Sequence, residues 1–111
     1  MSNVDVTMVR IYCSEQDGLH RELLELLHDQ EKVAGVTAFR GIAGFGGSGR
    51  MHQASLLDIS ADLPIIIEFF DRPTKVEAVM QHLKHKVAPG HIVSWSAMAN
   101  RASRSLGVIR S

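Results

Sequence analysis

The sequence has few of the residues that cross-link a protein chain or anchor it in a membrane. Its single cysteine, Cys13, excludes an internal disulfide and a multi-thiolate metal site, and agrees with a reducing compartment. No apolar run approaches the roughly 20 residues that cross a bilayer, and Asp5 interrupts the start where a signal peptide is apolar. With 111 residues, the chain has no room for a full dinucleotide-binding fold. We therefore expect one small cytoplasmic domain.

Acidic residues are absent after Glu77. Residues 1–77 hold twelve acids against seven bases, whereas residues 78–111 hold five bases and no acid. The formal net charge of zero therefore combines an acidic part and a basic end, and it says little about partners.

Hydrophobic periodicity predicts four strands and two helices. Alternation with β-branched residues is typical of strands, and apolar stripes at spacings of three and four are typical of helices. Strands are expected over residues 4–13, 36–43, 63–70 and 91–98, and helices over 17–32 and 74–87. The order β-α-β-β-α-β favours an α+β, ferredoxin-like fold, in which one antiparallel four-stranded sheet carries both helices on the same face.

The ends of these elements suggest how the chain is divided. Gly35 is expected to end the first helix. We expect a single domain over residues 1–98, with a long glycine-rich loop over 44–62 and a basic tail over 99–111.

The third predicted strand is apolar on both of its sides. Ile67 and Phe69 point to one side of the sheet, whereas Ile66 and Phe70 point to the other. Because two helices cover only one face, we expect other copies of the chain to cover the second in a homo-oligomer. The alternative is that the long loop folds over that face.

Five of the nine glycines lie between Gly41 and Gly49. Closely spaced glycines let backbone N–H groups converge on an anion, and Arg40, Arg50 and His52 can add charge-assisted hydrogen bonds to a phosphate. The same spacing also suits a flexible loop tip. The segment is neither a dinucleotide fingerprint, since no clear helix follows, nor a complete P-loop, since Arg50 stands in place of the lysine.

The remaining chemistry-bearing residues carry weaker signals. His82 and His85 have the spacing of two metal ligands on a helix, but a solvated polar face explains the pair more simply. Cys13 is expected to be a small buried hydrophobe. No catalytic triad or paired carboxylates stand out, and the expected sheet lacks the aromatic motif of RNA-binding domains. We therefore predict no metal site and no enzymatic activity, and RNA binding stays only a minor alternative.

Three segments resemble a known family. They are Gly18-Leu-His-Arg-Glu-Leu23, Arg40-Gly-Ile-Ala-Gly-Phe-Gly46 and Ser55-Leu-Leu-Asp58. On these segments, residues 4–98 resemble the PII-like family known as domain of unknown function 190 and, more distantly, the nitrogen-regulatory PII signalling proteins.

The resemblance implies a homotrimer with ligand clefts between its subunits and a mobile loop that regulates a partner protein. ATP, ADP, AMP or a cyclic nucleotide is the implied ligand, and no cofactor is implied to be required. Regulators of this type act on membrane transporters or metabolic enzymes. Gly44, Phe45 and Gly46 match the loop-base element that meets the nucleotide in PII proteins, and Arg101 with Arg104 match their C-terminal arginines.

The glycine-rich segment and the resemblance together predict a set of ligand-binding residues. They are Arg40, Gly41, Gly44, Phe45, Gly46, Gly49, Arg50, His52, Gly90, His91, Arg101 and Arg104. Two alternatives from other classes stay open. One is a trimeric metal-binding or metal-tolerance protein of similar fold, and the other is a small enzyme that acts on a phosphorylated substrate.

Overall fold

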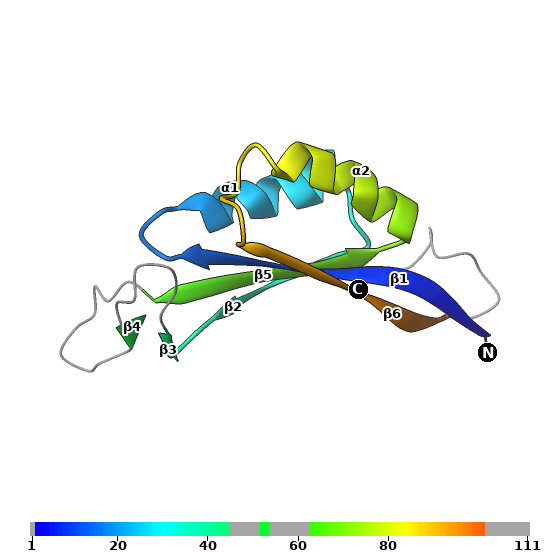
Figure 1. Ribbon diagram of the computed structural model, residues 1–111, viewed down its shortest axis with the longest axis horizontal. Coiled ribbons are helices and arrows are strands. Elements are labelled where there is room, and N and C mark those ends of the chain that lie inside the picture. The colour runs from blue at the N-terminus through cyan, green and yellow to red at the C-terminus, as the bar shows by residue number, and fades with distance from the viewer. Residues whose placement is uncertain (1, 45–51, 54–62, 102–111) are drawn as a thin grey trace.

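A computed structural model shows a four-stranded antiparallel sheet with helices on one of its faces (Figure 1). The structure describes residues 2–44, 52–53 and 63–101. Its elements are β1 (Ser2–Ser14), α1 (Leu19–Glu25), the π-helical turn η1 (Leu26–Gln30), β2 (Gly35–Arg40), β3 (Ala43–Gly44), β4 (His52–Gln53), β5 (Pro64–Asp71), α2 (Pro73–Leu83) and β6 (Ile92–Arg101). The predicted α+β, ferredoxin-like fold is confirmed. Within these ranges, neither helix has the length and apolar character that a membrane span requires.

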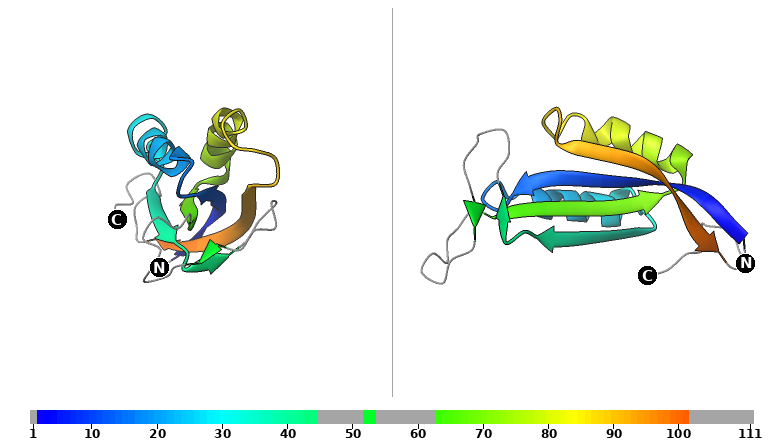
Figure 2. Two further views of the ribbon diagram at one scale, coloured as in Figure 1. Left: turned by 90° about the vertical axis from the view of Figure 1, so that its left-hand side faces the viewer. Right: turned by 60° about the horizontal axis from the view of Figure 1, so that its bottom comes forward.

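The first strand lies in the middle of the sheet, whose order is β2-β5-β1-β6. It pairs antiparallel with β5 as far as Thr7, which lies opposite Asp71. Beyond that point β1 continues beside β6 alone, until Ser2 lies opposite Arg101 (Figure 2). β6 is longer than predicted because β1 offers it a partner along its whole length, so residues 99–101 belong to the strand and not to the tail.

The hydrophobic core lies between the sheet and the two helices, which Figure 2 shows side by side above the same face. The apolar stripes predicted for both helices are the ones that are buried. The buried cluster consists of Val9, Ile11, Leu23, Leu26, Leu27, Ile65, Ile67, Phe69, Val76, Val79, Leu83 and Val87. Burial alternates along β5, as expected for a strand that presents different side chains to its two faces.

The first helix ends differently from the prediction. α1 widens into η1, in which the Glu31 N–H donates to the Leu26 carbonyl at 2.9 Å, five residues back. Lys32 then takes the left-handed conformation, with φ of 52°, that ends the helix. Gly35 is not the helix terminator, because it is already the first residue of β2.

The segment expected to be a loop over residues 44–62 is partly paired. Ala43 lies opposite Gln53, and Gly44 opposite His52, in the two-stranded ladder of β3 and β4. Gly44 is therefore a strand residue at the start of this segment.

The face of the sheet away from the helices is called the open face below. Register and alternation place on it every second residue of each strand. Its described residues include Met8, Arg10, Tyr12, Thr37, Phe39, Ile66, Glu68, Phe70, Val93, Trp95 and Ala97. The double-sided apolar character predicted for β5 is thus present, since Ile66 and Phe70 remain half-buried on the open face.

Candidate functional site

The predicted ligand-binding residues begin at one end of the sheet, where β1 and β2 end and β5 begins. Arg40 is the last residue of β2, and Glu15 directly follows β1. The Arg40 Nε atom lies 2.6 Å from Glu15 Oε2, and Nη2 lies 3.0 Å from Oε1, so the guanidinium grips the carboxylate with two nitrogens. This hydrogen-bonded carboxylate raises the pKa of the Arg40 guanidinium above its ordinary value. Arg40 is therefore a fixed cation at the start of the glycine-rich segment.

Glu15 is held in place by its own backbone. Its N–H donates to the Leu63 carbonyl at 2.9 Å, which ties the end of β1 to the residue before β5. Glu15 is not among the ligand-binding residues predicted from the sequence. A signal exists, because it is a carboxylate placed directly after a strand and two residues before the turn at Asp17 and Gly18.

Gly41 is required by packing. Its N–H donates to the Pro64 carbonyl at 2.8 Å. A Cβ atom at this position would lie 2.7 Å from Pro64 Cγ, closer than real Cβ contacts. Gly44 is also close to the same ring, with a hypothetical Cβ at 3.3 Å from Pro64 Cγ. These two glycines let the chain leaving β2 pass tightly over the start of β5.

Gly90 and His91 lie at the same end of the sheet, but at its opposite edge. Gly90 has a φ of 84°, a conformation that favours glycine. The His91 carbonyl oxygen accepts a hydrogen bond from the Tyr12 N–H at 2.9 Å. The Nδ1 atom of the His91 ring lies 3.2 Å from the Tyr12 carbonyl oxygen. Because β5 and β1 separate β2 from β6, His91 and Arg40 are roughly 14 Å apart across the sheet.

Arg101 lies at the far end of the molecule. It pairs with Ser2, at the opposite end of β1 from Glu15. A strand of this length spans roughly 40 Å. One copy of the chain therefore does not bring Arg101 to Arg40.

The other predicted site residues belong to the glycine-rich segment and the basic tail. Phe45, Gly46, Gly49, Arg50 and Arg104 lie outside the described residues. His52 is described as part of β4, opposite Gly44 in the ladder.

The histidines of α2 and its C-terminal turn are not assembled as metal ligands in the described part of the chain. His82 Nδ1 lies 2.8 Å from Glu31 Oε2, in a contact that joins α2 to the end of the first helix. No group of three or more His, Cys, Asp or Glu side chains within the described ranges is placed to hold a metal ion.

Cys13 packs against the core on the helix side of β1. Its partial burial, and secondarily the carboxylate of Asp17, raises the pKa of the thiol from 9.0 to about 11. We expect iodoacetamide to alkylate the folded protein with a midpoint near pH 11, because the thiolate is the nucleophile. The measurement is the alkylation rate against pH, with the urea-unfolded chain as the control.

The same shift makes the stability of the protein depend on pH. Between pH 9.0 and about 11 the folded chain holds the Cys13 proton more tightly than the unfolded chain does, so stability falls as pH rises through this window. An alkylation midpoint at pH 9.0 in the folded protein would contradict the burial of this thiol.

Comparison with known proteins decides the family. The model of DUF190, described as an uncharacterized ACR, matches residues 6–99. The chain belongs to the DUF190 family. A UPF0166 protein of Aquifex aeolicus (strain VF5) is 28% identical to this DUF190 chain over 91 residues, which cover 78% of this chain and 86% of the relative.

Solved structures of PII-like proteins share the fold of this DUF190 chain. CPII from Thiomonas intermedia K12, bound to ADP and bicarbonate, superposes with a TM-score of 0.66 at 20% identity, covering 90% of this chain and 93% of CPII. A further structure of CPII, described as a nitrogen regulatory PII-like protein, is bound to ADP, AMP and bicarbonate. CutA1 from Oryza sativa superposes with a TM-score of 0.56 at 13% identity, covering 96% of this chain and 89% of CutA1.

Proposed function

We propose that this DUF190 protein is a non-enzymatic regulator that binds an adenine nucleotide, or a related phosphorylated metabolite, in a cleft between subunits. The ligand binds at the end of the sheet where Arg40 and Gly41 lie, and its binding controls a partner protein through the glycine-rich segment that starts there. The observation that carries this proposal is a fixed arginine at the entry to a glycine-rich segment, on a fold shared with ADP-bound CPII.

The chemistry of Arg40 supports a phosphate ligand. The guanidinium already binds a carboxylate through two nitrogens, and a phosphate group offers oxygens in the same geometry. A phosphate would therefore compete directly with Glu15 for Arg40. Because Gly41 follows Arg40 and is bound to Pro64, release of Arg40 from Glu15 changes the anchoring of the whole segment.

The placement of the remaining predicted residues supports a cleft between subunits. Arg101 is roughly 40 Å from Arg40 along the sheet of one copy, and His91 lies at the opposite sheet edge. A second copy can bring its Arg101 or His91 beside Arg40, whereas the same copy cannot. We therefore propose that the assembly is a homotrimer, as the resemblance to PII-like proteins implies. We further propose that its target protein is a membrane transporter or a metabolic enzyme.

Removal of the Glu15 charge is expected to strengthen nucleotide binding. In Glu15→Gln the guanidinium of Arg40 loses its competing anion, so ADP affinity should rise by about 2- to 5-fold, the value of an exposed ion pair. Arg40→Ala should lower affinity by roughly 10- to 100-fold, because a charge-assisted hydrogen bond is lost. Titration calorimetry with ADP, ATP and AMP measures both changes.

The matched control is Arg21→Ala, which removes an exposed arginine from α1 away from the Glu15–Arg40 pair. It should leave the affinity unchanged. Absence of heat from the wild-type protein with all three nucleotides would refute nucleotide binding. Hydrolysis of a nucleotide by the purified protein would instead favour the alternative that the protein is a small enzyme acting on a phosphorylated substrate.

Metal binding is the second candidate, because the fold is shared with CutA1, which in Ehrlichia chaffeensis is described as a divalent ion tolerance protein. The double variant His82→Ala and His85→Ala tests it by titration with Cu²⁺ or Zn²⁺. Loss of uptake in the variant would support a metal site on α2, and unchanged uptake would remove these histidines from consideration.

A further inference from the structure

The open face exposes large apolar side chains in the single chain. Phe39 and Val93 are each 46% exposed, and Tyr12 and Trp95 are each 40% exposed. Aromatic residues, methionine and arginine are the types enriched in the cores of protein interfaces. The open face therefore has the composition of a surface that is covered in the working protein.

A pair of opposite charges lies in the middle of this apolar face. Arg10 on β1 lies directly opposite Glu68 on β5, and its Nε donates to Glu68 Oε1 at 2.7 Å. The guanidinium carbon is 5.6 Å from the centre of the Trp95 ring, close enough for a cation–π contact. The Glu68 carboxylate, and next Tyr12, raise the pKa of the Arg10 guanidinium, so this residue stays charged.

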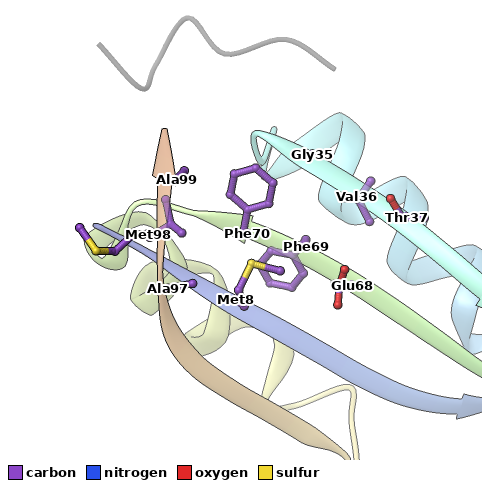
Figure 3. Close-up of a pocket in the computed structure, with 11 residues that line it drawn as sticks. Met8, Gly35, Val36, Thr37, Glu68, Phe69, Phe70, Ala97, Met98 and Ala99 are labelled. Carbon is purple, nitrogen blue, oxygen red and sulfur yellow. The ribbon is translucent and has the colours of Figure 1, made fainter. Parts of the chain in front are cut away.

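The face is hollowed next to this pair. A hollow of about 350 Å³ is lined by Glu68 and by apolar side chains that include Met8, Phe70 and Ala97 (Figure 3). The Glu68 side chain is only 21% exposed, whereas the Arg10 side chain is 41% exposed. If the apolar surface of a partner filled this hollow, the Arg10–Glu68 pair would become less accessible to water.

The pair of opposite charges on this face fits a second copy of the chain as the occupant. Arg10 and Glu68 cancel one another, so the middle of the face has no surplus charge to attract an acidic or a basic partner. A second copy presents the same cation and the same anion. The Arg10 guanidinium has N–H donors beyond the one that Glu68 receives, and Glu68 has a second oxygen, so pairs from two copies can complete each other.

We propose that the Arg10–Glu68 pair fixes the number and orientation of the copies that assemble through the open face. This inference rests on the self-association included in the proposed function. The apolar side chains supply the affinity, whereas burial of two charges contributes little net affinity, because desolvation offsets their attraction. The pair contributes specificity, since only arrangements that keep each charge partnered avoid a buried, uncompensated ion.

The test compares loss of one charge with loss of both. Glu68→Leu leaves Arg10 without its partner, and we expect association to weaken by at least about 100-fold. The double variant Arg10→Met and Glu68→Leu is expected to associate as tightly as the wild type, but as a mixture of oligomers. Sedimentation velocity and native mass spectrometry measure both. Trp95, the single tryptophan, reports coverage of the face through a concentration-dependent blue shift of its fluorescence.

Two further variants keep the comparison interpretable. Glu22→Leu removes an exposed ion pair with Lys86, 2.8 Å long, on the helix side, and should assemble like the wild type. Glu68→Gln preserves the shape of the side chain, and circular dichroism verifies its folding should Glu68→Leu fail to fold. We expect it to weaken association by at least about 10-fold.

The outcomes separate this inference from the proposed function. The role of the pair would be overturned if Glu68→Leu or Glu68→Gln assembled like the wild type. It would also be overturned if the double variant formed one defined oligomer. ADP calorimetry on the same samples tests nucleotide binding independently. A wild-type protein that stays monomeric would overturn both this role and the cleft between subunits.

Discussion

Replacement of Phe69 by alanine is expected to lower the free energy of unfolding by about 3–5 kcal/mol. Phe69 is 1% exposed and lies in the core between β5 and the helices. Truncation removes its transfer free energy and leaves a cavity in a tightly packed interior. Since domains of this size are stable by roughly 5–15 kcal/mol, one substitution should remove a large part of the total.

The adjacent residue provides the matched control. Phe70 has the same side chain but lies on the open face, only half-buried. In urea unfolding followed by circular dichroism, the Phe69→Ala loss should be similar at high and low protein concentration. The Phe70→Ala loss should shrink as the protein is diluted, because it arises from self-association. Equal losses at every concentration would mean that both faces of β5 are packed alike within one chain.

Addition of one methyl group at Gly41 is expected to destabilise the protein by about 1–3 kcal/mol and to weaken nucleotide binding. The new Cβ would lie 2.7 Å from Pro64 Cγ, and a proline ring cannot rotate away from it. The chain after β2 must shift, and the Arg40–Glu15 contact and the Gly41–Pro64 hydrogen bond shift with it. Urea unfolding and ADP calorimetry measure the two effects.

The clash itself can be tested by a double-mutant cycle. Pro64→Ala removes the Cγ atom, so Gly41→Ala should cost less in that background, with a coupling of roughly 1–2 kcal/mol. Gly35→Ala is the control at the other end of β2, where a Cβ would make an ordinary 3.8 Å contact with Phe70. If Gly41→Ala were as harmless as Gly35→Ala, packing against Pro64 would not explain the glycine.

Local periodicity predicts the fold of this chain because each element buries a single stripe of side chains. Leu23 and Leu27 on the first helix, and Val79 and Leu83 on the second, are fully buried as their spacing predicts. The limits of the elements depend on distant partners. β6 reaches Arg101 because residues at the opposite end of the sequence extend β1, and no local pattern near Arg101 shows this.

The candidate site is less predictable from sequence for the same reason. Arg40 and the glycines are visible as a motif in the sequence. The carboxylate that holds Arg40 belongs to Glu15, which directly follows β1, and β5 separates β1 from β2 in the sheet. The Arg10–Glu68 pair is different. In the alternating pattern of their strands, both charged residues fall among the residues that point to the open face. Knowledge of the strand pairing alone would therefore have placed them on one surface.

The central position of β1 also determines when this protein can fold during its synthesis. Both strands that pair with β1 come from the second half of the chain, and the first described residue pairs with the last. Such non-local pairing makes folding slow, because long loops close before their contacts form. Until β6 has left the ribosome, β1 has an unpaired edge, which is a template for aggregation. We therefore expect the described sheet to form as one cooperative unit, only after β6 has been synthesised.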